Sequence, residues 1–214
     1  YKTAAQLETS VIPASQSLLG RNQGGYARSG YYNLLAPGDD YVNTFKWPAL
    51  YQNTYNTPAS DGLITGAWKD HFNGVHAANI AIEKISGFEG EINENDKNRL
   101  LGEAYFLRAL HYMHLCSMFG ETVPLIERPV QDASEYYPEN ATAGQVYALI
   151  ISDFQKASEL LPLRSALYAN GANRGRATKG AAQAYLAKAY MYRPILETGQ
   201  AAGLIKSQNE PKKV

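Results

Sequence analysis

Apolar residues recur along much of the chain at steps of three and four positions, which is the spacing of one face of an α-helix. The first such stretch is predicted to stop at Gly87. One face of this stretch carries the apolar residues Trp68, Phe72, Val75 and Ile82 together with Asn79. The second stretch begins near Asn93 or Asn95 as the N-cap and is predicted to end at Gly120 in a left-handed conformation. Both stretches are therefore expected to form amphipathic helices.

A third and a fourth stretch follow the same spacing nearer the C-terminus. Thr142 and Gln145 stand in capping-box spacing at the start of the third stretch, which is expected to stop at Pro162. The fourth stretch lies within residues 178–194, and its helix is expected to end before Pro194. Its alanines would let a neighbouring backbone approach closely. Because no comparable run alternates apolar and polar residues, the pattern predicts an all-α fold.

Two segments break the helical pattern. Residues 121–140 contain three prolines and no clean period, which predicts an extended connector laid over the helices. Residues 20–60 are rich in glycine, asparagine, proline and aromatic residues, with a short helix predicted from Trp47 to Tyr55. We expect the surface chemistry of the protein in this second segment.

An arginine interrupts the apolar stripe of the second helical stretch. Arg108 shares a helix face with Tyr105 and Tyr112. An arginine keeps its charge, so its burial demands a carboxylate or several carbonyl partners, which Glu103 or an acid on a neighbouring helix could supply. We expect Arg108 to be largely buried and bonded in this way. The alternative is a side chain that extends its head group to the edge of the core.

The run GEAYFLRALHYMHLCSMFGETVPLI, residues 102–126, resembles a helix and the following turn of the SusD/RagB family of surface nutrient-binding lipoproteins. The family pattern is Glu-Ala-x-Phe-Leu-Arg-Ala, then aromatic residues, then Phe-Gly-x-x-Pro. The positions that match are Glu103, Ala104, Phe106, Leu107, Arg108, Ala109, Tyr112, Phe119, Gly120 and Pro124.

Three further stretches agree with the same family in order and spacing. Residues 68–85 are similar to its Trp-to-Ala-Asn helix, residues 177–192 to its alanine-rich helix, and residues 147–162 fall correctly between them. On these motifs the chain is identified as a member of the family, with the best match over residues 60–193.

The resemblance implies tetratricopeptide-like helix pairs that form a right-handed helical scaffold with long loops, in a lipoprotein on the outer membrane at the cell surface. It implies binding of an oligosaccharide for import through a partner TonB-dependent, SusC-like transporter, without catalysis. The alternatives are an oligopeptide ligand in the same system, or a helical docking adaptor that binds no ligand. Structural roles are implied for the residues of the matched motifs, namely Trp68, Asn79, Glu103, Arg108, Gly120 and Pro124.

The aromatic segment fits the ligand that the resemblance implies. A sugar site needs flat aromatic rings for stacking and amides for hydrogen bonds to hydroxyl groups. Trp47, Tyr51 and Tyr55 are spaced by four, and Asn53 lies near them. These four residues are the candidate ligand-binding residues. The other interpretation, which stays open, is that this stripe packs on the scaffold.

Composition narrows the partners further. The 214 residues are expected to form one domain, residues 1–214, which corresponds to the N-terminal helical domain of the family. Because family members are usually more than twice as long, the resemblance implies that the chain is a fragment or a truncated member. Twenty basic residues balance twenty acidic ones, so the net charge does not favour binding to a nucleic acid, and no nucleic-acid partner is expected. With no long apolar run and no signal-peptide pattern, membrane contact is expected only through a lipid anchor that is absent from this chain.

Histidine spacing gives no metal motif. His111 and His114 share a helix face, but no third ligand stands at a compelling spacing, and His71 and His76 point in different directions. We expect no metal site and no cofactor. Cys116, the single cysteine, is expected to be a small buried residue.

Overall fold

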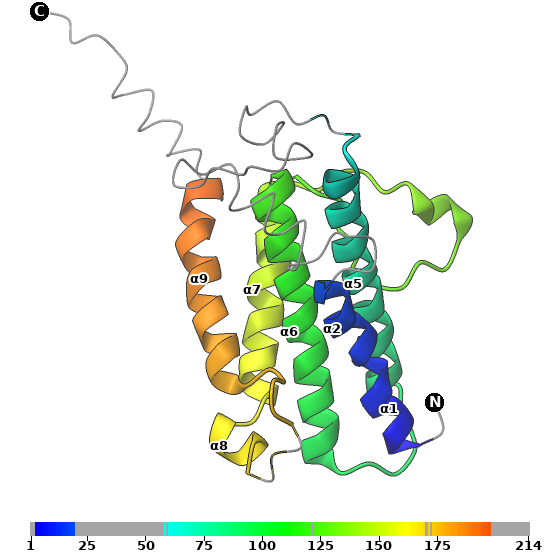
Figure 1. Cartoon of the computed structure of the whole chain (residues 1–214), viewed down its shortest axis with the longest axis vertical. Coiled ribbons are helices and arrows are strands. Elements are labelled where there is room, and N and C mark those ends of the chain that lie inside the picture. Colours follow the sequence, from blue (N-terminus) through cyan, green and yellow to red (C-terminus); the bar gives the residue numbers. More distant parts are fainter. Residues whose placement is uncertain are drawn as a thin grey trace, which may run out of the picture.

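The computed structural model of the chain describes residues 3–19, 58, 60–120, 122–169, 171 and 173–197. Within these residues, long helices run side by side in alternating directions (Figure 1). They are α5 (Gly62–Ser86), α6 (Glu94–Phe119), α7 (Ala143–Leu160) and α9 (Lys179–Glu197). Each long helix packs against the next one in sequence. The all-α prediction is confirmed for the described part of the chain, where the β-type pairing is an isolated bridge between Pro124 and Asn140.

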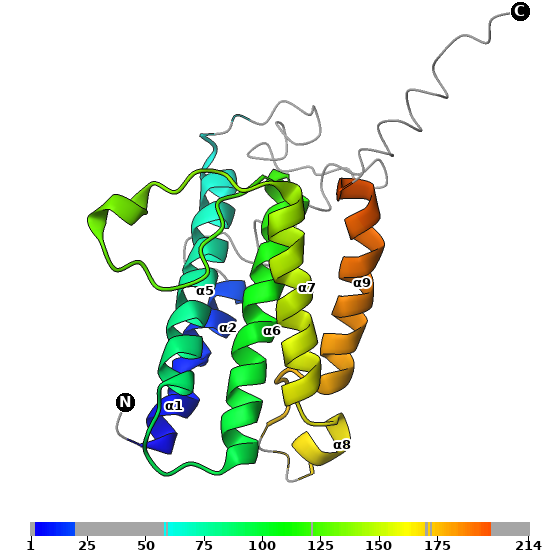
Figure 2. The same ribbon diagram turned by 180° about the vertical axis from the view of Figure 1, so that it is seen from behind.

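Shorter elements cover both faces of this layer. The helices α1 (Ala4–Ser10) and α2 (Ile12–Leu19) lie over α5 and α6 on the face that Figure 1 shows in front. The connector from α6 to α7 crosses the opposite face and projects outward (Figure 2). It contains the 3₁₀ helix η2 (Ala133–Tyr136), and α8 (Arg164–Leu167) lies at the foot of the bundle between α7 and α9.

The predicted helix ends are largely where the sequence placed them. The Asn93 side chain caps α6 by accepting a hydrogen bond from the backbone N–H of Asn95. Gly120 ends α6 with a φ of 84°, and its N–H donates to the Cys116 carbonyl at 3.1 Å. Thr142 and Gln145 form the predicted capping box of α7. These ends depend on residues within one helical turn, so the sequence is sufficient to locate them.

Three expectations need correction. The helix α9 continues past Pro194 to Glu197, because a proline removes one hydrogen bond but does not have to end a helix. The connector is not extended throughout, since it contains η2. The helices α1 and α2 were not predicted, because each offers only a turn or two of apolar spacing. Their buried side chains nevertheless follow the helical period at Leu7, Val11 and Ala14.

Aromatic residues hold the core together at two levels. The Trp68 ring lies against Phe72 and Phe119, with centroid distances of 4.7 and 5.0 Å, so Trp68 joins α5 to the end of α6. Phe106 on α6 contacts Phe154 on α7 and Tyr185 on α9. No helix in the described ranges is long and apolar enough to cross a membrane.

Candidate functional site

Arg108 lies at the centre of a buried polar cluster that joins three elements. The residue is 4% exposed, and its Nε and Nη2 donate to the two carboxylate oxygens of Asp153 on α7 at 2.7 and 2.8 Å. Nη1 donates to the Asn79 side-chain oxygen and to the Glu127 carbonyl, both at 2.8 Å. Burial alone lowers the pKa of Arg108, but the hydrogen bonds and charge of Asp153 raise it above its ordinary value. The predicted burial of Arg108 is confirmed.

The cluster attaches the connector to the bundle. Asn79 donates from its side-chain amide to the Ile126 carbonyl at 2.8 Å, and the Ile126 N–H donates to the Tyr112 hydroxyl at 2.7 Å. Together with the bond from Arg108 to Glu127, these contacts fix the first half of the connector on α5 and α6. Pro124 lies in the same segment and forms the bridge to Asn140. The cluster therefore has a structural role. The partner of Arg108 is an acid on a neighbouring helix, which was one of the two predicted options, although the sequence did not single out Asp153.

A signal for Asp153 was present in the sequence. It lies on the same helical stripe as Val146, Ile150 and Ala157, all of which are fully buried. An acid on an apolar stripe and an arginine on the stripe of the preceding helix complement each other. Glu103, the other candidate partner, pairs with Arg176 instead.

Glu103 forms a second charged cluster, nearer the N-terminal end of α6 than Arg108. It is 4% exposed, and Arg176 donates to its carboxylate at 2.8 Å. Arg176 also pairs with Glu8 on α1 at 2.6 Å, and Glu8 accepts from Arg99 on α6. These pairs attach both α1 and the loop before α9 to α6, so they shape the surface between α2 and that loop.

Three histidines, of which His71 and His111 are buried and His114 is partly buried, form a group between α5, α6 and α2. Nε2 of His111 donates to the Ala14 carbonyl at 2.9 Å, since a carbonyl can only accept. In the neutral ring Nδ1 of His111 then accepts from Nδ1 of His71 at 3.0 Å, and the His71 ring stacks on His114. Burial is the largest cause that lowers the pKa of His71 to about 2 and of His111 and His114 to about 4. The group fastens α2 to α6 in its neutral form.

Gly74 makes room for His111, and an alanine there should therefore destabilise the protein. A Cβ at position 74 would overlap the His111 ring, which must shift and give up its bond to Ala14. We expect Gly74→Ala to lower the free energy of unfolding by about 1–3 kcal/mol, measured by urea unfolding. Gly62→Ala in the same helix is the control, because its Cβ meets nothing within 4 Å. Equal stability of the two variants would contradict this account.

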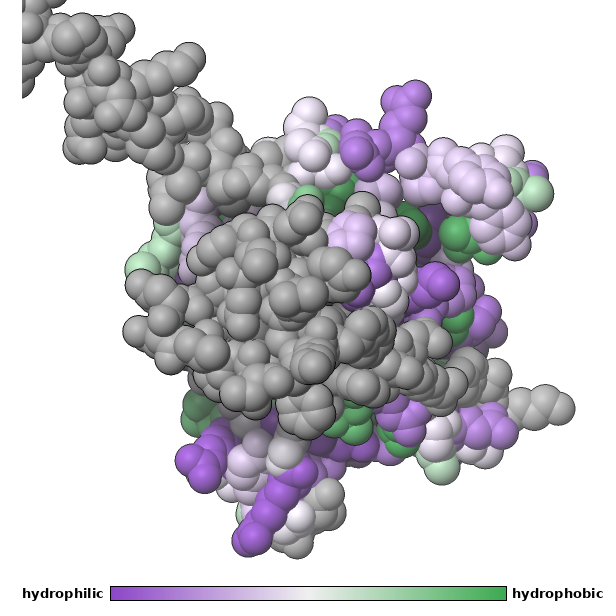
Figure 3. Space-filling view, turned by 45° about the horizontal axis from the view of Figure 1, so that its top comes forward, coloured by the Kyte–Doolittle hydropathy of each residue, from purple (hydrophilic) through white to green (hydrophobic). Residues whose placement is uncertain are grey.

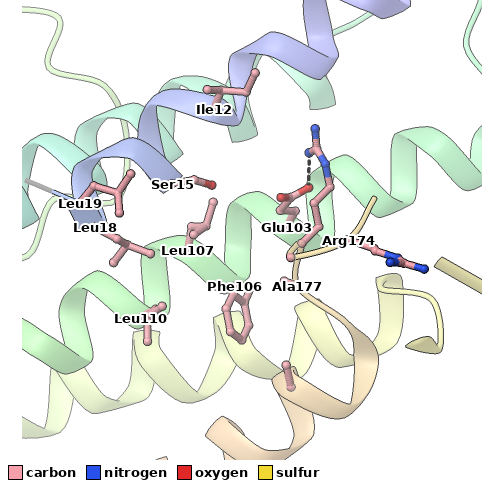
Figure 4. Close-up of a pocket in the computed structure, with 13 residues that line it drawn as sticks. Ile12, Ser15, Leu18, Leu19, Glu103, Phe106, Leu107, Leu110, Arg174 and Ala177 are labelled. Carbon is pink, nitrogen blue, oxygen red and sulfur yellow. Dashed lines mark hydrogen bonds and ion pairs between the residues drawn. The ribbon is translucent and has the colours of Figure 1, made fainter. Parts of the chain in front are cut away.

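A groove of about 620 Å³ lies between α2, α6 and the loop before α9 (Figure 4). Its floor is aliphatic, with Leu107 and Leu110 from α6 facing Leu18 from α2. Ser15 contributes a hydroxyl, and Glu103 closes one end in its ion pair. Such a surface can bind apolar faces of a ligand, but the one aromatic residue among its described lining residues, Phe106, is only 7% exposed. Ring stacking of the kind that sugars favour is therefore weak here.

The candidate ligand-binding residues Trp47, Tyr51, Asn53 and Tyr55 lie outside the described residues. The four positions are not described, so the choice between ligand binding and scaffold packing stays a prediction. Among described residues, Tyr136 and Tyr137 at the projecting end of the connector are 67% and 91% exposed. On the face shown in Figure 3, hydrophobic residues of the described part appear in small separate patches among hydrophilic ones. Within the described residues, no group of three or more histidine, cysteine, aspartate or glutamate side chains is arranged so that it could hold a metal ion.

The fold and the surface together define a helical-repeat scaffold with a ligand-sized groove. A SusD-like family model with the description "Starch-binding associating with outer membrane" matches residues 10–191, so the chain belongs to the SusD-like family. SusD-like protein P2 of Formosa agariphila is 35% identical over 90% of this chain and 37% of that protein. A SusD-like protein of Bacteroides ovatus is 29% identical over 72% of this chain and 27% of that protein.

Solved structures agree with this assignment at the level of the fold. A laminarin-binding SusD-like protein superposes with a TM-score of 0.75 at 24% identity, over 90% of this chain and 41% of that one. A SusD superfamily protein from Bacteroides vulgatus gives 0.76 at 21% identity, over 90% of this chain and 40% of that one. These are tetratricopeptide-like helical folds, which confirms the predicted fold class. The chain spans well under half the length of these relatives.

Proposed function

We propose that the protein captures oligosaccharides at the outer surface of the outer membrane, held there by a lipid anchor, and passes them to a TonB-dependent, SusC-like transporter. The observation that carries this proposal is the family match over residues 10–191, because the family's description names starch binding and outer-membrane association. The laminarin-binding structural neighbour supports a glycan as the ligand. The proposal includes no catalysis. The buried carboxylates described above form ion pairs with arginines.

Two other functions remain as alternatives, and the experiments described below distinguish them from glycan capture. An oligopeptide could use the groove of Figure 4, whose floor is aliphatic and whose end carries the Glu103 ion pair. A docking adaptor needs a broad apolar surface, whereas the described part of the face in Figure 3 has small patches. A glycan array and calorimetry with matched peptides separate the ligand classes. Crosslinking to a co-expressed SusC-like transporter tests the partner.

We place the principal sugar contacts at Trp47, Tyr51, Asn53 and Tyr55, on the sequence argument alone. Trp47→Ala should weaken glycan binding while leaving the helical circular-dichroism signal and the melting temperature nearly unchanged, because a ring that stacks on sugar lies outside the core. Calorimetric titration and thermal melting of the same variant measure both quantities.

The matched control for this prediction is Trp68→Ala. Trp68 packs against Phe72 and Phe119, so its removal should cost roughly 3–5 kcal/mol and affect binding only through unfolding. If Trp47→Ala behaves like Trp68→Ala, Trp47 belongs to the scaffold. If it changes neither binding nor stability, it has neither role.

A further inference from the structure

Among the described residues, some arginines form an ion pair with a carboxylate and others do not. Arg99, Arg108, Arg128 and Arg176 each form an ion pair with an aspartate or a glutamate. Arg164 and Arg174 have no such partner among the described residues, and both are exposed. In a chain whose charges balance overall, two guanidinium groups without acids mark a local excess of positive charge.

These two arginines line one open pocket at the foot of the bundle. The pocket has a volume of about 770 Å³, and Ser165 and Tyr168 complete its described lining, which contains no acidic residue. Arg164 and Ser165 come from α8, and Arg174 comes from the loop before α9. Figure 4 shows Arg174 pointing away from the leucines of the groove, toward the other side of this loop. Arg174 also lines one side of the groove, so the two concave surfaces meet at this residue.

The aromatic wall of the pocket is held in place by the ion-pair cluster. The Tyr168 hydroxyl donates to the Arg176 carbonyl at 2.9 Å, and Arg176 is anchored by Glu103 and Glu8. The guanidinium carbon of Arg164 lies 5.8 Å from the centre of the Tyr168 ring. The ring is therefore positioned before a ligand arrives, which lowers the entropy cost of binding.

This combination of groups matches an acidic sugar residue. A guanidinium binds a carboxylate or a sulfate with two parallel hydrogen bonds, a tyrosine ring contacts the C–H face of a pyranose, and a serine hydroxyl bonds to a sugar hydroxyl. We propose that the pocket formed by Arg164, Ser165, Tyr168 and Arg174 is a subsite for a uronate or sulfate-ester sugar of the bound glycan. This inference rests on the proposed function and names its substrate class.

The test compares neutral and acidic polysaccharides at about 0.15 M salt, where distant surface charges are largely screened. Calorimetry uses laminarin and dextran as neutral probes, polygalacturonate as the carboxylate probe, and carrageenan and dextran sulfate as sulfate probes. We expect the whole chain to bind one acidic class about tenfold or more tighter than the neutral probes, since charge-assisted hydrogen bonds are strong. The class that binds identifies the anion.

Variants locate the binding. The double substitution Arg164→Gln and Arg174→Gln should weaken binding of the acidic probe roughly 10- to 100-fold and leave neutral binding unchanged. Arg174→Lys should bind the acidic probe with an affinity between those of the wild type and the double variant, because lysine keeps the charge but not the bidentate geometry. Lys84→Gln, which removes one positive charge from an exposed position on α5, is the control for a non-specific effect of charge. The variants should fold normally, because neither arginine holds an ion pair among the described residues.

Several outcomes would overturn the inference. Equal binding of neutral and acidic probes, or equal losses in the double variant and in Lys84→Gln, would show that the pocket does not select acidic sugars, while the proposed glycan capture would stand. Binding of no glycan at all would remove both proposals. Arginine-dependent binding to phosphatidylglycerol vesicles, without acidic-glycan binding, would make the pocket a lipid contact instead.

Discussion

Replacing Arg108 by alanine is expected to lower the free energy of unfolding by about 3–5 kcal/mol, because it leaves a buried charge without its partner. The stranded group is Asp153, whose side chain is completely buried. Asn79 and the Glu127 carbonyl lose a donor at the same time, so the connector is loosened as well. Urea unfolding followed by circular dichroism measures the change.

A surface pair and a double substitution are the controls for this result. Arg128→Ala breaks an exposed pair with Glu135 and should leave stability nearly unchanged. Arg108→Met combined with Asp153→Leu removes both charges and should recover most of the loss, since the cost comes from the unpaired ion. If Arg108→Ala unfolds at the same urea concentration as Arg128→Ala, the buried cluster does not contribute as described.

Acidification below about pH 6.5 is expected to destabilise the protein through its buried histidines. The pKa of His111 falls from 6.5 to about 4 on folding, so between these values the unfolded chain binds a proton that the folded chain does not. Stability is therefore complete above about pH 6.5 and falls with pH, by up to about 1.4 kcal/mol per pH unit for each such histidine. For His111 the loss continues to about pH 4. His71 and His114 add to it in the same direction.

The slope of the free energy of unfolding against pH separates the contribution of the histidines from that of other groups. Burial raises the pKa of Glu103 and Asp153, so these carboxyls act in the opposite direction at low pH and are common to all variants. Urea unfolding at pH 7.5, 6 and 5 should show a smaller slope for His111→Gln than for the wild type, even though this variant is less stable at pH 7.5. His76→Gln, at an exposed position on α5, is the control. An unchanged slope in His111→Gln would rule out the histidine mechanism.

Features that depend on neighbouring residues could be predicted from the sequence. The long helices, the Asn93 and Thr142 caps and the left-handed Gly120 follow from apolar spacing and cap residues within one turn. The burial of Arg108 also follows, because its stripe must face another helix. For the ligand-binding residues the sequence gives a hypothesis at Trp47, Tyr51, Asn53 and Tyr55, and these positions are not described.

Contacts between distant segments required the tertiary structure. Arg108 and Asp153 are 45 positions apart, and although Asp153 stands on an apolar stripe, the sequence alone does not show which acid Arg108 contacts. The attachment of α2 through His111 joins residues 97 positions apart. The arginine pocket at α8 combines side chains from two segments that have no common period. Such groupings arise because the long helices pack as a layer and bring their ends and connecting loops together. The amino-acid sequence by itself therefore determined the helices and their buried faces, while the partners of the buried charges and the composition of the surface pockets were decided only by how the helices pack.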